Sequence, residues 1–367
     1  MRAAGSTGSL NGSPSCIDAR IAQLVTDLQR VDPADPDAGV IARAAELLRA
    51  GGVVAFPTET VYGLGAHALD RAAILRVFAA KERPANDPLI VHVATLDAAT
   101  PLVQEIPPVA RELAARFWPG PLTMVLKRSA RVPDEVTAGL ATVAIRVPSH
   151  PVARALLERA RIPIAAPSAN LFSRPSPTRA AHVLADLNGR IDLIIDGGAT
   201  DVGLESTVID LSGGVPTILR PGAIDLDALR QVIPDVVSGR AATLPTAAMP
   251  SPGMLPKHYS PITPLTLYEA DRETALVRMK RDAQQRLSRG ESVVVLSYTE
   301  DVGELGNLGV QLVELASESN PVAVAARLYA ALRECDELGA GAILVRTITT
   351  RHPLSSAIQD RLRRAAA

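Results

Sequence analysis

Six prolines fall within residues 245–264, and this segment constrains the fold more than any other feature of the sequence. Proline lacks a backbone N–H and fixes φ, so such a segment sustains neither a helix nor a central strand and stays extended. The chain of 367 residues is also longer than a usual single domain. We therefore predict two folded domains joined by an extended linker over residues 241–264.

The part before the linker alternates short β-rich runs with helical stretches, which predicts a mixed α/β domain over residues 37–240. A helix over 37–49 should end at Gly51-Gly52 and lead into a strand over 53–56. Further strands are expected at 89–93, 122–126, 143–147, 162–166, 193–195, 207–211 and 217–219, and helices at 70–81, 109–117, 151–159 and 178–187.

The two ends of the chain differ in character. Residues 1–36 are rich in Gly, Ser, Ala and Asp and are predicted to be a flexible extension with one weakly helical stretch over 16–28. After the linker, helices are expected at 272–289, 322–338 and 354–364, and strands at 292–297 and 342–348. This alternation predicts a smaller parallel α/β domain over 265–367.

Composition narrows the class of partner. The formal net charge is −1 and aromatic residues make up 3%, so there is no overall attraction for a polyanion and little platform for stacked bases. Cys16 and Cys335 alone cannot form a four-cysteine zinc site or a disulfide-dense secreted scaffold. No apolar run is long enough to span a bilayer and no secretory signal is evident, so we expect a cytoplasmic location and no membrane partner.

Common catalytic signatures are absent: there is no phosphate loop, no His-Glu-x-x-His and no Gly-x-Ser-x-Gly. Gly63 and Gly65 match the relaxed dinucleotide pattern Gly-x-Gly-x-x-Ala. Pro57 and the polar residues that follow it fit the required strand-to-helix turn poorly, so we disfavour dinucleotide binding.

Polar side chains interrupt strands that are otherwise apolar. Arg146 lies in a strand where an unpaired guanidinium would be costly to bury, so it needs an internal or a ligand anion. His92 has a similar place, and a lone histidine there is more often a hydrogen-bonded core residue than a ligand contact. Arg220 ends another strand. Their convergence predicts a site for a phosphate or a carboxylate.

Two short motifs could complete such a site. Lys81 and Arg83 stand beside a stiff proline turn and could clamp phosphate, although such a motif taken alone is more often a solvated helix end. Ser168 and Asn170 follow an apolar strand at the edge where α/β sheets bind ligands, with turn capping as the alternative.

Residues 57–222 contain, in order, the segments PTETVYGLG, KERPxxxPLIVHV, FWPGPLTMVL, VAIRVPxHP, PIAAPSANxxxRPSPT, GLESTVID and ILRPG. Together they resemble the YrdC-like domain of threonylcarbamoyl-AMP synthases. The later segments SPGMLPKHYSP and LYAALRECDELGA resemble the linker and second domain of the longer Sua5 form of that family. The resemblance implies a twisted mixed sheet flanked by helices, followed by a smaller Rossmann-like α/β domain.

The reaction implied by the resemblance joins L-threonine, bicarbonate or CO2 and ATP into threonylcarbamoyl-AMP and pyrophosphate, with Mg²⁺ carried on the triphosphate. The product would pass to the transferase machinery that makes threonylcarbamoyladenosine in transfer RNA. No protein nucleophile is needed, because the protein aligns two anionic reactants and neutralises the leaving group.

The resemblance also implies roles for individual residues. The expected catalytic residues are Lys81, Arg83, Ser168 and Asn170. The expected threonine pocket comprises Thr60, His92, Arg146, Ala166 and Ser206. The expected ATP contacts are Arg83, Asp87, Thr142, Ser168, Ser176, Arg220 and Tyr259. Because Tyr259 lies in the linker, the resemblance implies that the linker is also a lid over the nucleotide.

One of these positions departs from the family pattern. The family usually reads Asp-Asn-Pro-Leu where this chain has Asn86-Asp87-Pro88-Leu89, so Asp87 occupies a position where an Asn contacts the nucleotide. A carboxylate there would repel phosphates unless it met the metal.

Two other functions compete with synthesis of the adenylate. YrdC-like domains also resemble proteins credited with double-stranded RNA binding, so weak binding of transfer RNA is an alternative. The hydrogenase-maturation carbamoyltransferase contains this domain too, but its zinc fingers need more cysteines than this chain has.

Overall fold

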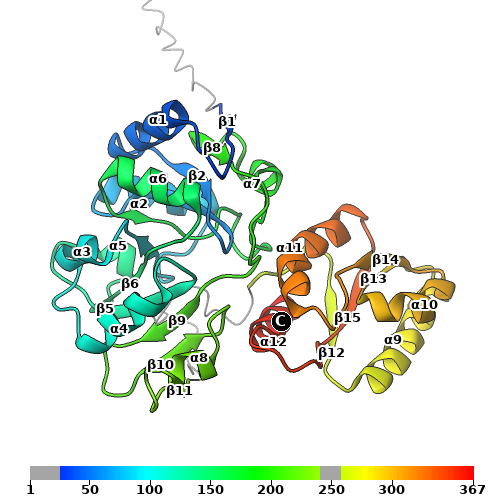
Figure 1. The fold of residues 1–367 in the computed structure, drawn as a ribbon. Helices are drawn as coiled ribbons and strands as arrows, with labels where there is room; N and C mark the ends of the chain where they lie inside the picture. Colours follow the sequence, from blue (N-terminus) through cyan, green and yellow to red (C-terminus); the bar gives the residue numbers. More distant parts are fainter. Residues whose placement is uncertain (1–24, 240–257) are drawn as a thin grey trace, which may run out of the picture.

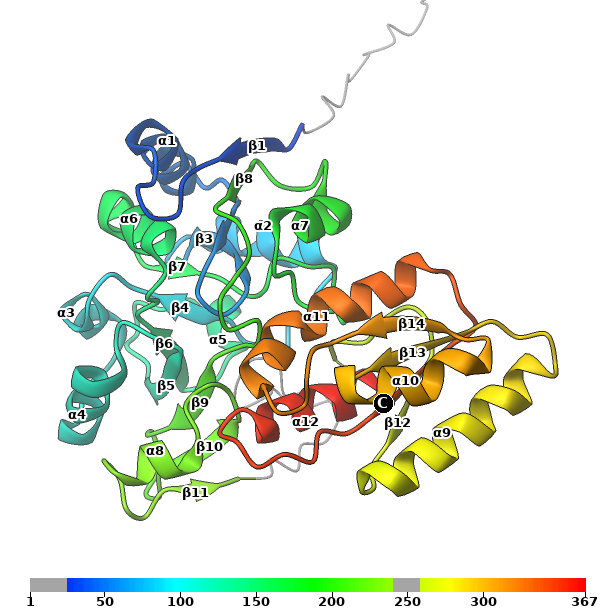
Figure 2. The same ribbon diagram turned by 45° about the vertical axis from the view of Figure 1, so that its right-hand side comes forward.

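The computed structural model describes residues 25–239 and 258–367, which form two α/β domains side by side (Figures 1 and 2). The first domain is built on an eleven-stranded mixed sheet. Its strands follow one another across the sheet in the order β1 (Asp27–Arg30), β8 (Leu193–Asp196), β2 (Val54–Pro57), β3 (Tyr62–His67), β7 (Ile164–Ala165), β4 (Ile90–His92), β6 (Thr142–Arg146), β5 (Leu122–Lys127), β9 (Thr207–Asp210), β10 (Thr217–Arg220) and β11 (Val237–Ser238).

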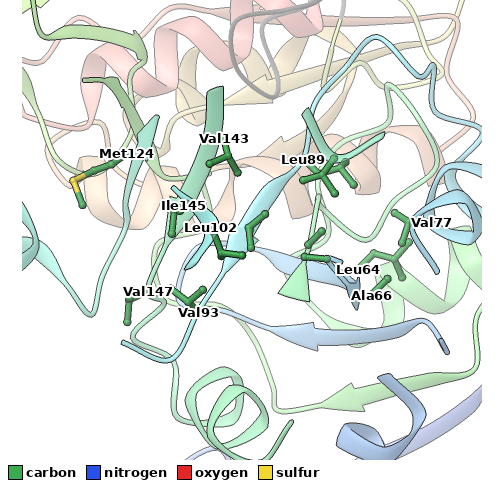
Figure 3. Packing of buried hydrophobic residues seen from close by; sticks show 14 of the residues in the cluster. Leu64, Ala66, Val77, Leu89, Val93, Leu102, Met124, Val143, Ile145 and Val147 are labelled. Atoms are coloured by element: carbon green, nitrogen blue, oxygen red, sulfur yellow. The ribbon is translucent and has the colours of Figure 1, made fainter. Parts of the chain in front are cut away.

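Helices cover both faces of this sheet, because successive strand residues point to opposite sides. Val54 and Phe56 of β2 pack with α1 (Ala38–Arg49) and α6 (Pro151–Ala160), whereas Ala55 belongs to the core on the other face. That second core includes α2 (Arg71–Lys81), α4 (Pro108–Phe117) and α7 (Ala180–Leu187). Figure 3 shows Leu64 and Ala66 of β3 against Val77 of α2. Short helices α3 (Leu96–Ala99), α5 (Asp134–Thr137) and α8 (Leu226–Arg230) complete the domain.

The second domain has a four-stranded parallel sheet with the order β12 (Leu265–Tyr268), β15 (Ala342–Arg346), β13 (Val293–Ser297) and β14 (Gln311–Glu314). Val293 and Val295 pack toward α9 (Arg272–Leu287) and α10 (Val302–Leu305), while Val294 and Leu296 pack toward α11 (Pro321–Glu337) and α12 (Ser355–Ala365). The core on the α11 and α12 side also contains Val61, Leu204 and Tyr259, so it is continuous with the first domain and the linker.

The predicted fold class is confirmed, with a mixed sheet followed by a smaller parallel one. The N-terminal boundary is wrong in part. Residues 27–30 form β1, which pairs in parallel with β8, and only residues 1–24 lie outside the described part of the chain. Most of the predicted linker, residues 241–257, also lies outside it. The Gly63 and Gly65 pair is part of β3, antiparallel to β2, and does not form a dinucleotide-binding turn. None of the helices within residues 25–239 and 258–367 is long and apolar enough to cross a membrane.

Candidate active site

A cavity with an empty volume of about 520 Å³ lies where the strand ends of the first domain meet the linker. We call it the central cavity. Its wall comes from the loops beside strands β2, β7 and β9, from residues within strands β3, β4, β6 and β10, and from the turn after α2. Its lining residues are Thr58, Thr60, Val61, Gly63, Arg83, Ile90, His92, Arg146, Ala166, Pro167, Ser168, Glu205, Ser206, Arg220, His258 and Tyr259.

Arg146 is the most completely held cation of the cavity wall. It is 3% exposed, and its Nη2 lies 2.7 Å from Oε1 of Glu59. Its Nη1 donates to the Thr60 hydroxyl at 2.9 Å and its Nε to the Gly120 carbonyl at 3.2 Å. Burial alone would raise the pKa of Glu59, but the charge and hydrogen bond of Arg146 hold that pKa below its ordinary value. The internal anion expected for Arg146 is therefore Glu59.

His92 lies beside Arg146, because the two residues are register partners in the parallel pair β4 and β6. Burial and then the nearby Arg146 charge lower the pKa of His92 to about 3. The imidazole is thus neutral near pH 7. Its Nδ1 has no hydrogen-bond partner within the described residues, although the side chain is buried in the cavity wall.

Arg83 reaches the cavity from the turn after α2 and is anchored by the Asp87 turn. Its Nη2 lies 2.8 Å from the Asp87 carboxylate and donates to the Pro88 carbonyl at 2.9 Å, while its Nε donates to the Asp87 carbonyl at 3.2 Å. Asp87 is fully buried and does not line the cavity. The carboxylate at this departure from the family pattern therefore orients Arg83.

Lys81 and Asn170 lie behind the wall. The Lys81 ammonium is buried and donates to the carbonyls of Ser168 and Asn170 at 2.5 and 2.6 Å. Burial, followed by the neighbouring Arg83 charge, lowers the pKa of Lys81 well below its ordinary value. The Asn170 amide donates to the carbonyls of Leu171 and Arg174. These contacts fix the loop whose Ser168 lines the cavity, so Lys81 and Asn170 hold the backbone in this structure.

Ser206 and Arg220 form another part of the cavity wall, beside strands β9 and β10. The Arg220 guanidinium donates to the Ser206 carbonyl from Nε at 3.1 Å and from Nη2 at 3.0 Å, and Nη2 lies 3.1 Å from the Ser206 hydroxyl. That hydroxyl also shares a 2.8 Å hydrogen bond with Thr123, a buried residue that the sequence interpretation did not select.

Glu205 is a further lining residue that the sequence interpretation missed. It accepts hydrogen bonds from Ser176 at 2.5 Å, from Tyr329 at 2.8 Å and from Arg361 at 2.8 Å. Burial would raise the pKa of Glu205, but the charges of Arg361 and then Arg220 bring it to about 2. Ser176 therefore does not line the cavity but contacts the lining residue Glu205 from behind. No local signal marks Glu205, because its partners Tyr329 and Arg361 belong to the other domain.

The linker closes the cavity with His258 and Tyr259. Tyr259 is 1% exposed, has a φ of 61°, and packs between the rings of His258 and Tyr329 at centroid distances of 4.0 and 5.4 Å. Its hydroxyl has no hydrogen-bond partner in the described part of the chain. An unpartnered buried hydroxyl in a cavity wall is suited to a polar ligand.

The structure thus brings most of the predicted site together. The predicted residues that line the central cavity are Thr60, Arg83, His92, Arg146, Ala166, Ser168, Ser206, Arg220 and Tyr259. Lys81, Asp87, Asn170 and Ser176 contact those residues or their loops from behind. Thr142 starts β6, four residues from Arg146, and lines a separate small cavity with Leu89 and Val125. Its contact with ATP stays a prediction.

Arg83, Arg146 and Arg220 line one preformed cavity together with a neutral histidine and several hydroxyls. Arginines donate in forks that match carboxylate and phosphate oxygens, so this arrangement defines a site for anionic ligands at the edge of a mixed sheet. The fold and the site therefore define an α/β protein with a preformed anion-binding cavity.

Comparison with known proteins narrows the class. The family described as "Telomere recombination" (Sua5, YciO and YrdC) matches residues 46–222, and the family described as "Threonylcarbamoyl-AMP synthase, C-terminal domain" matches residues 224–367. A threonylcarbamoyl-AMP synthase from Pyrococcus abyssi is 43% identical over 88% of this chain and 93% of its own length. One from Bacillus subtilis is 43% identical over 89% and 92%.

A solved structure agrees with both. The crystal structure of P. abyssi Sua5 complexed with L-threonine superposes with a TM-score of 0.85 at 39% identity, covering 93% of this chain and 98% of that one. The chain belongs to the threonylcarbamoyl-AMP synthase family, in its two-domain Sua5 form.

Proposed function

We propose that this protein is an L-threonylcarbamoyladenylate synthase, which forms threonylcarbamoyl-AMP and pyrophosphate from L-threonine, bicarbonate or CO2 and ATP. The observation that carries the proposal is the buried group of Arg146, Glu59, Thr60 and His92 at one end of a cavity whose other arginines are Arg83 and Arg220. The names and the threonine complex of the relatives supply the two substrates.

The reaction needs two bond-forming steps. The neutral threonine amine attacks CO2: an N–C bond forms, one C–O π bond opens onto oxygen, and the nitrogen loses a proton to water, which leaves a carbamate. A carbamate oxygen then attacks the α-phosphorus of ATP, and the bond to the β-phosphate oxygen breaks as pyrophosphate leaves. Neither step requires covalent attachment to the protein, so alignment and charge stabilisation are the protein's contributions.

The threonine half would use the Arg146 end of the cavity. The Arg146 fork would bind the substrate carboxylate, with Thr60 and Ser206 as neighbouring hydroxyls and Ala166 as the wall. The neutral imidazole of His92 can accept or donate one hydrogen bond without adding charge. The Glu59 carboxylate does not line the cavity and would act by holding Arg146 in place.

The nucleotide half would use the remaining cations. Arg83 and Arg220 would neutralise charge on the phosphates, and Ser168 and Tyr259 would offer hydroxyls. Lys81, Asn170 and Asp87 would act by holding Ser168 and Arg83 in place. We retain Ser176 as an indirect ATP residue, acting through Glu205.

Mg²⁺ is proposed to enter with the nucleotide. No group of three or more metal-binding side chains occurs within the described residues, and both Glu205 and Asp87 already contact arginines. Mg²⁺ tolerates a shell made mostly of phosphate oxygens and water, which fits a site without a carboxylate cage. When bound, the ion would neutralise triphosphate charge.

We also propose that the product passes to the machinery that modifies transfer RNA, and that the protein works in the cytoplasm. Direct binding of RNA is a weaker candidate, since the chain carries a net charge of −1 and the comparisons support the synthase.

Incubation of the purified protein with labelled L-threonine, bicarbonate and ATP tests the reaction. We expect threonylcarbamoyl-AMP and pyrophosphate in equal amounts, both dependent on threonine and bicarbonate. Turnover of ATP that is indifferent to threonine would contradict the proposal. Serine in place of threonine provides a matched control for recognition of the methyl group.

A further inference from the structure

Glu205 places a carboxylate in the wall of a cavity that the proposed reaction fills with phosphates. A bare carboxylate there would repel a triphosphate. Its oxygens are occupied instead by three donors: the hydroxyl of Ser176 on Oε1, and the hydroxyl of Tyr329 and the Nε of Arg361 on Oε2. Two of the three, including the only cation, come from helices of the second domain.

Arg361 makes further contacts with the same wall. It is 0% exposed, although it lies on α12, a helix with exposed polar residues. Its Nη2 donates to the carbonyl of Pro221, the residue after Arg220, at 3.1 Å. Its guanidinium carbon lies 5.2 Å from the ring centroid of Tyr259. One side chain of the second domain therefore touches a wall carboxylate, the backbone beside a wall arginine, and the ring of the linker tyrosine.

A fully desolvated arginine is retained at such a position only when its surroundings satisfy it. Glu205, Pro221 and Tyr259 do so here, and Asp360 accepts from Nη1 at 2.6 Å. These contacts offset the cost of burying the cation. All of them except Asp360 belong to the first domain or to the linker. The second domain thus supplies a charge that balances a carboxylate in the cavity wall, in addition to packing against the surface of the first domain.

We propose that Arg361 is a positioning residue of the nucleotide site, supplied by the C-terminal domain. It compensates the charge of Glu205 and holds Tyr259 and the Arg220-Pro221 backbone in the geometry that receives the triphosphate. This inference rests on the proposed function for the identity of the ligand. When the second domain packs against the first, Arg361 reaches the cavity wall, and the affinity of the site for ATP depends on that contact.

A purely structural role for Arg361 is the competing explanation, and Arg333 offers a matched control. Arg333 lies on α11, is 5% exposed, and joins the same two domains. Its Nη2 donates to Asp186 at 2.7 Å and to the Pro175 carbonyl at 2.5 Å. Neither Arg333 nor Asp186 lines the central cavity, and Arg174 also lies 3.1 Å from Asp186, so that carboxylate has a second cationic partner.

The experiment uses the full chain and measures binding of a non-hydrolysable ATP analogue by calorimetry, together with the KM values for ATP and threonine. Arg361→Met should weaken binding of the analogue by about 10–100-fold and leave the threonine KM within about twofold, because an unpaired buried carboxylate costs roughly this much. The double variant Arg361→Met with Glu205→Gln should recover most of the loss. Arg333→Met should lower the thermal midpoint with analogue affinity unchanged.

Equal weakening by Arg361→Met and Arg333→Met, or no recovery in the double variant, would overturn the inference. If Arg361→Met does not fold, Arg361→Lys decides. Lysine keeps the charge but cannot reach Glu205 and the Pro221 carbonyl as a fork. It should weaken binding severalfold, and unchanged affinity would contradict the proposal.

The outcomes separate this inference from the proposed function. A wild-type protein that binds the analogue but makes no threonylcarbamoyl-AMP refutes the reaction and leaves the comparison of variants valid. A wild-type protein that makes the product while Arg361→Met binds normally refutes the role of Arg361 alone.

Discussion

His92 and Arg146 are register partners on the adjacent parallel strands β4 and β6, and both side chains line the central cavity. The strand pairing therefore fixes a neutral hydrogen-bonding group beside a cation. Their environments differ, since Arg146 has Glu59 and Thr60 as partners while His92 Nδ1 has none within the described residues. A ligand in the cavity that contacts both residues would meet the positively charged guanidinium of Arg146 and would also fill the open hydrogen-bonding position at His92 Nδ1.

Replacement of Arg146 by Lys should raise the KM for threonine by at least tenfold and change the KM for ATP little. The lysine ammonium keeps the charge but loses the fork that contacts Glu59, Thr60 and Gly120 together. Steady-state kinetics with each substrate varied in turn measures this. Equal rises in both KM values would place Arg146 outside the threonine half.

His92 should stay neutral throughout the physiological pH range. Burial and the Arg146 charge lower its pKa to about 3, so the imidazole should show no titration between pH 8 and pH 5. Nuclear magnetic resonance of histidine labelled with ¹⁵N measures this. A His92 transition near pH 6.5 would show that the imidazole is not buried beside Arg146 in solution.

Glu205 should make folding stability depend on acid. Its pKa is lowered to about 2, below the ordinary value of 4.5, so its stabilising contribution is complete above pH 4.5 and lost as the pH falls toward 2. The contribution is on the order of 3 kcal/mol. Urea unfolding at several pH values should therefore show a shallower acid dependence for Glu205→Gln than for the wild type. Parallel curves for the two proteins would contradict the buried pair with Arg361.

Asp87→Asn restores the residue type that the family pattern has at this position and removes the ion pair with Arg83. Because Asp87 orients Arg83 from behind the wall, the variant should raise the KM for ATP about fivefold, the effect of losing roughly 1 kcal/mol of charge-assisted hydrogen bonding. Kinetics with ATP varied checks this. A lower KM would mean that the carboxylate faces the phosphates and repels them.

Gly203→Ala should loosen the contact between the domains. Gly203 has a φ of 75°, and an added Cβ would stand 2.4 Å from Cα of Ala326 on α11. Because this neighbour is a backbone atom of a helix, it cannot move aside as a flexible side chain could. Gly198→Ala is the control, since Gly198 has a φ of 85° but nothing within 4 Å of an added Cβ. Both variants carry backbone strain of about 1 kcal/mol. Only Gly203→Ala should increase proteolysis near the linker, and equal sensitivity would mean that strain alone acts.

The sequence predicts the elements whose signals are local. The helix over 37–49 appears as α1 at 38–49, because Asp37 caps it and its apolar residues repeat at helical spacing. The strands β1, β3, β11, β12 and β14 were not predicted. Four of them, β1, β11, β12 and β14, are short strands at a sheet edge, and β3 is a central strand interrupted by Gly63 and Gly65. Their state depends on tertiary pairing more than on propensity.

The site follows the same division. Arg146 and His92 were recognisable because polar side chains in apolar strands need a reason to be there. The sequence did not mark three further residues of the site: Glu205, Tyr329 and Arg361. A carboxylate in a glycine-rich loop and polar residues on amphipathic helices are common features that indicate no particular site. Their partnership spans sequence separations of 124 and 156 residues, which no local pattern encodes.

The shared apolar core around α11 and α12 has a thermodynamic consequence. Val61 and Leu204 of the first domain and Tyr259 of the linker pack in the same cluster as Leu328 and Ile358 of the second. Neither domain can lose its structure without exposing part of the other's interior, so heat should melt the two together in one cooperative transition. The two domains then unfold as parts of a single cooperative unit and not as two independent ones.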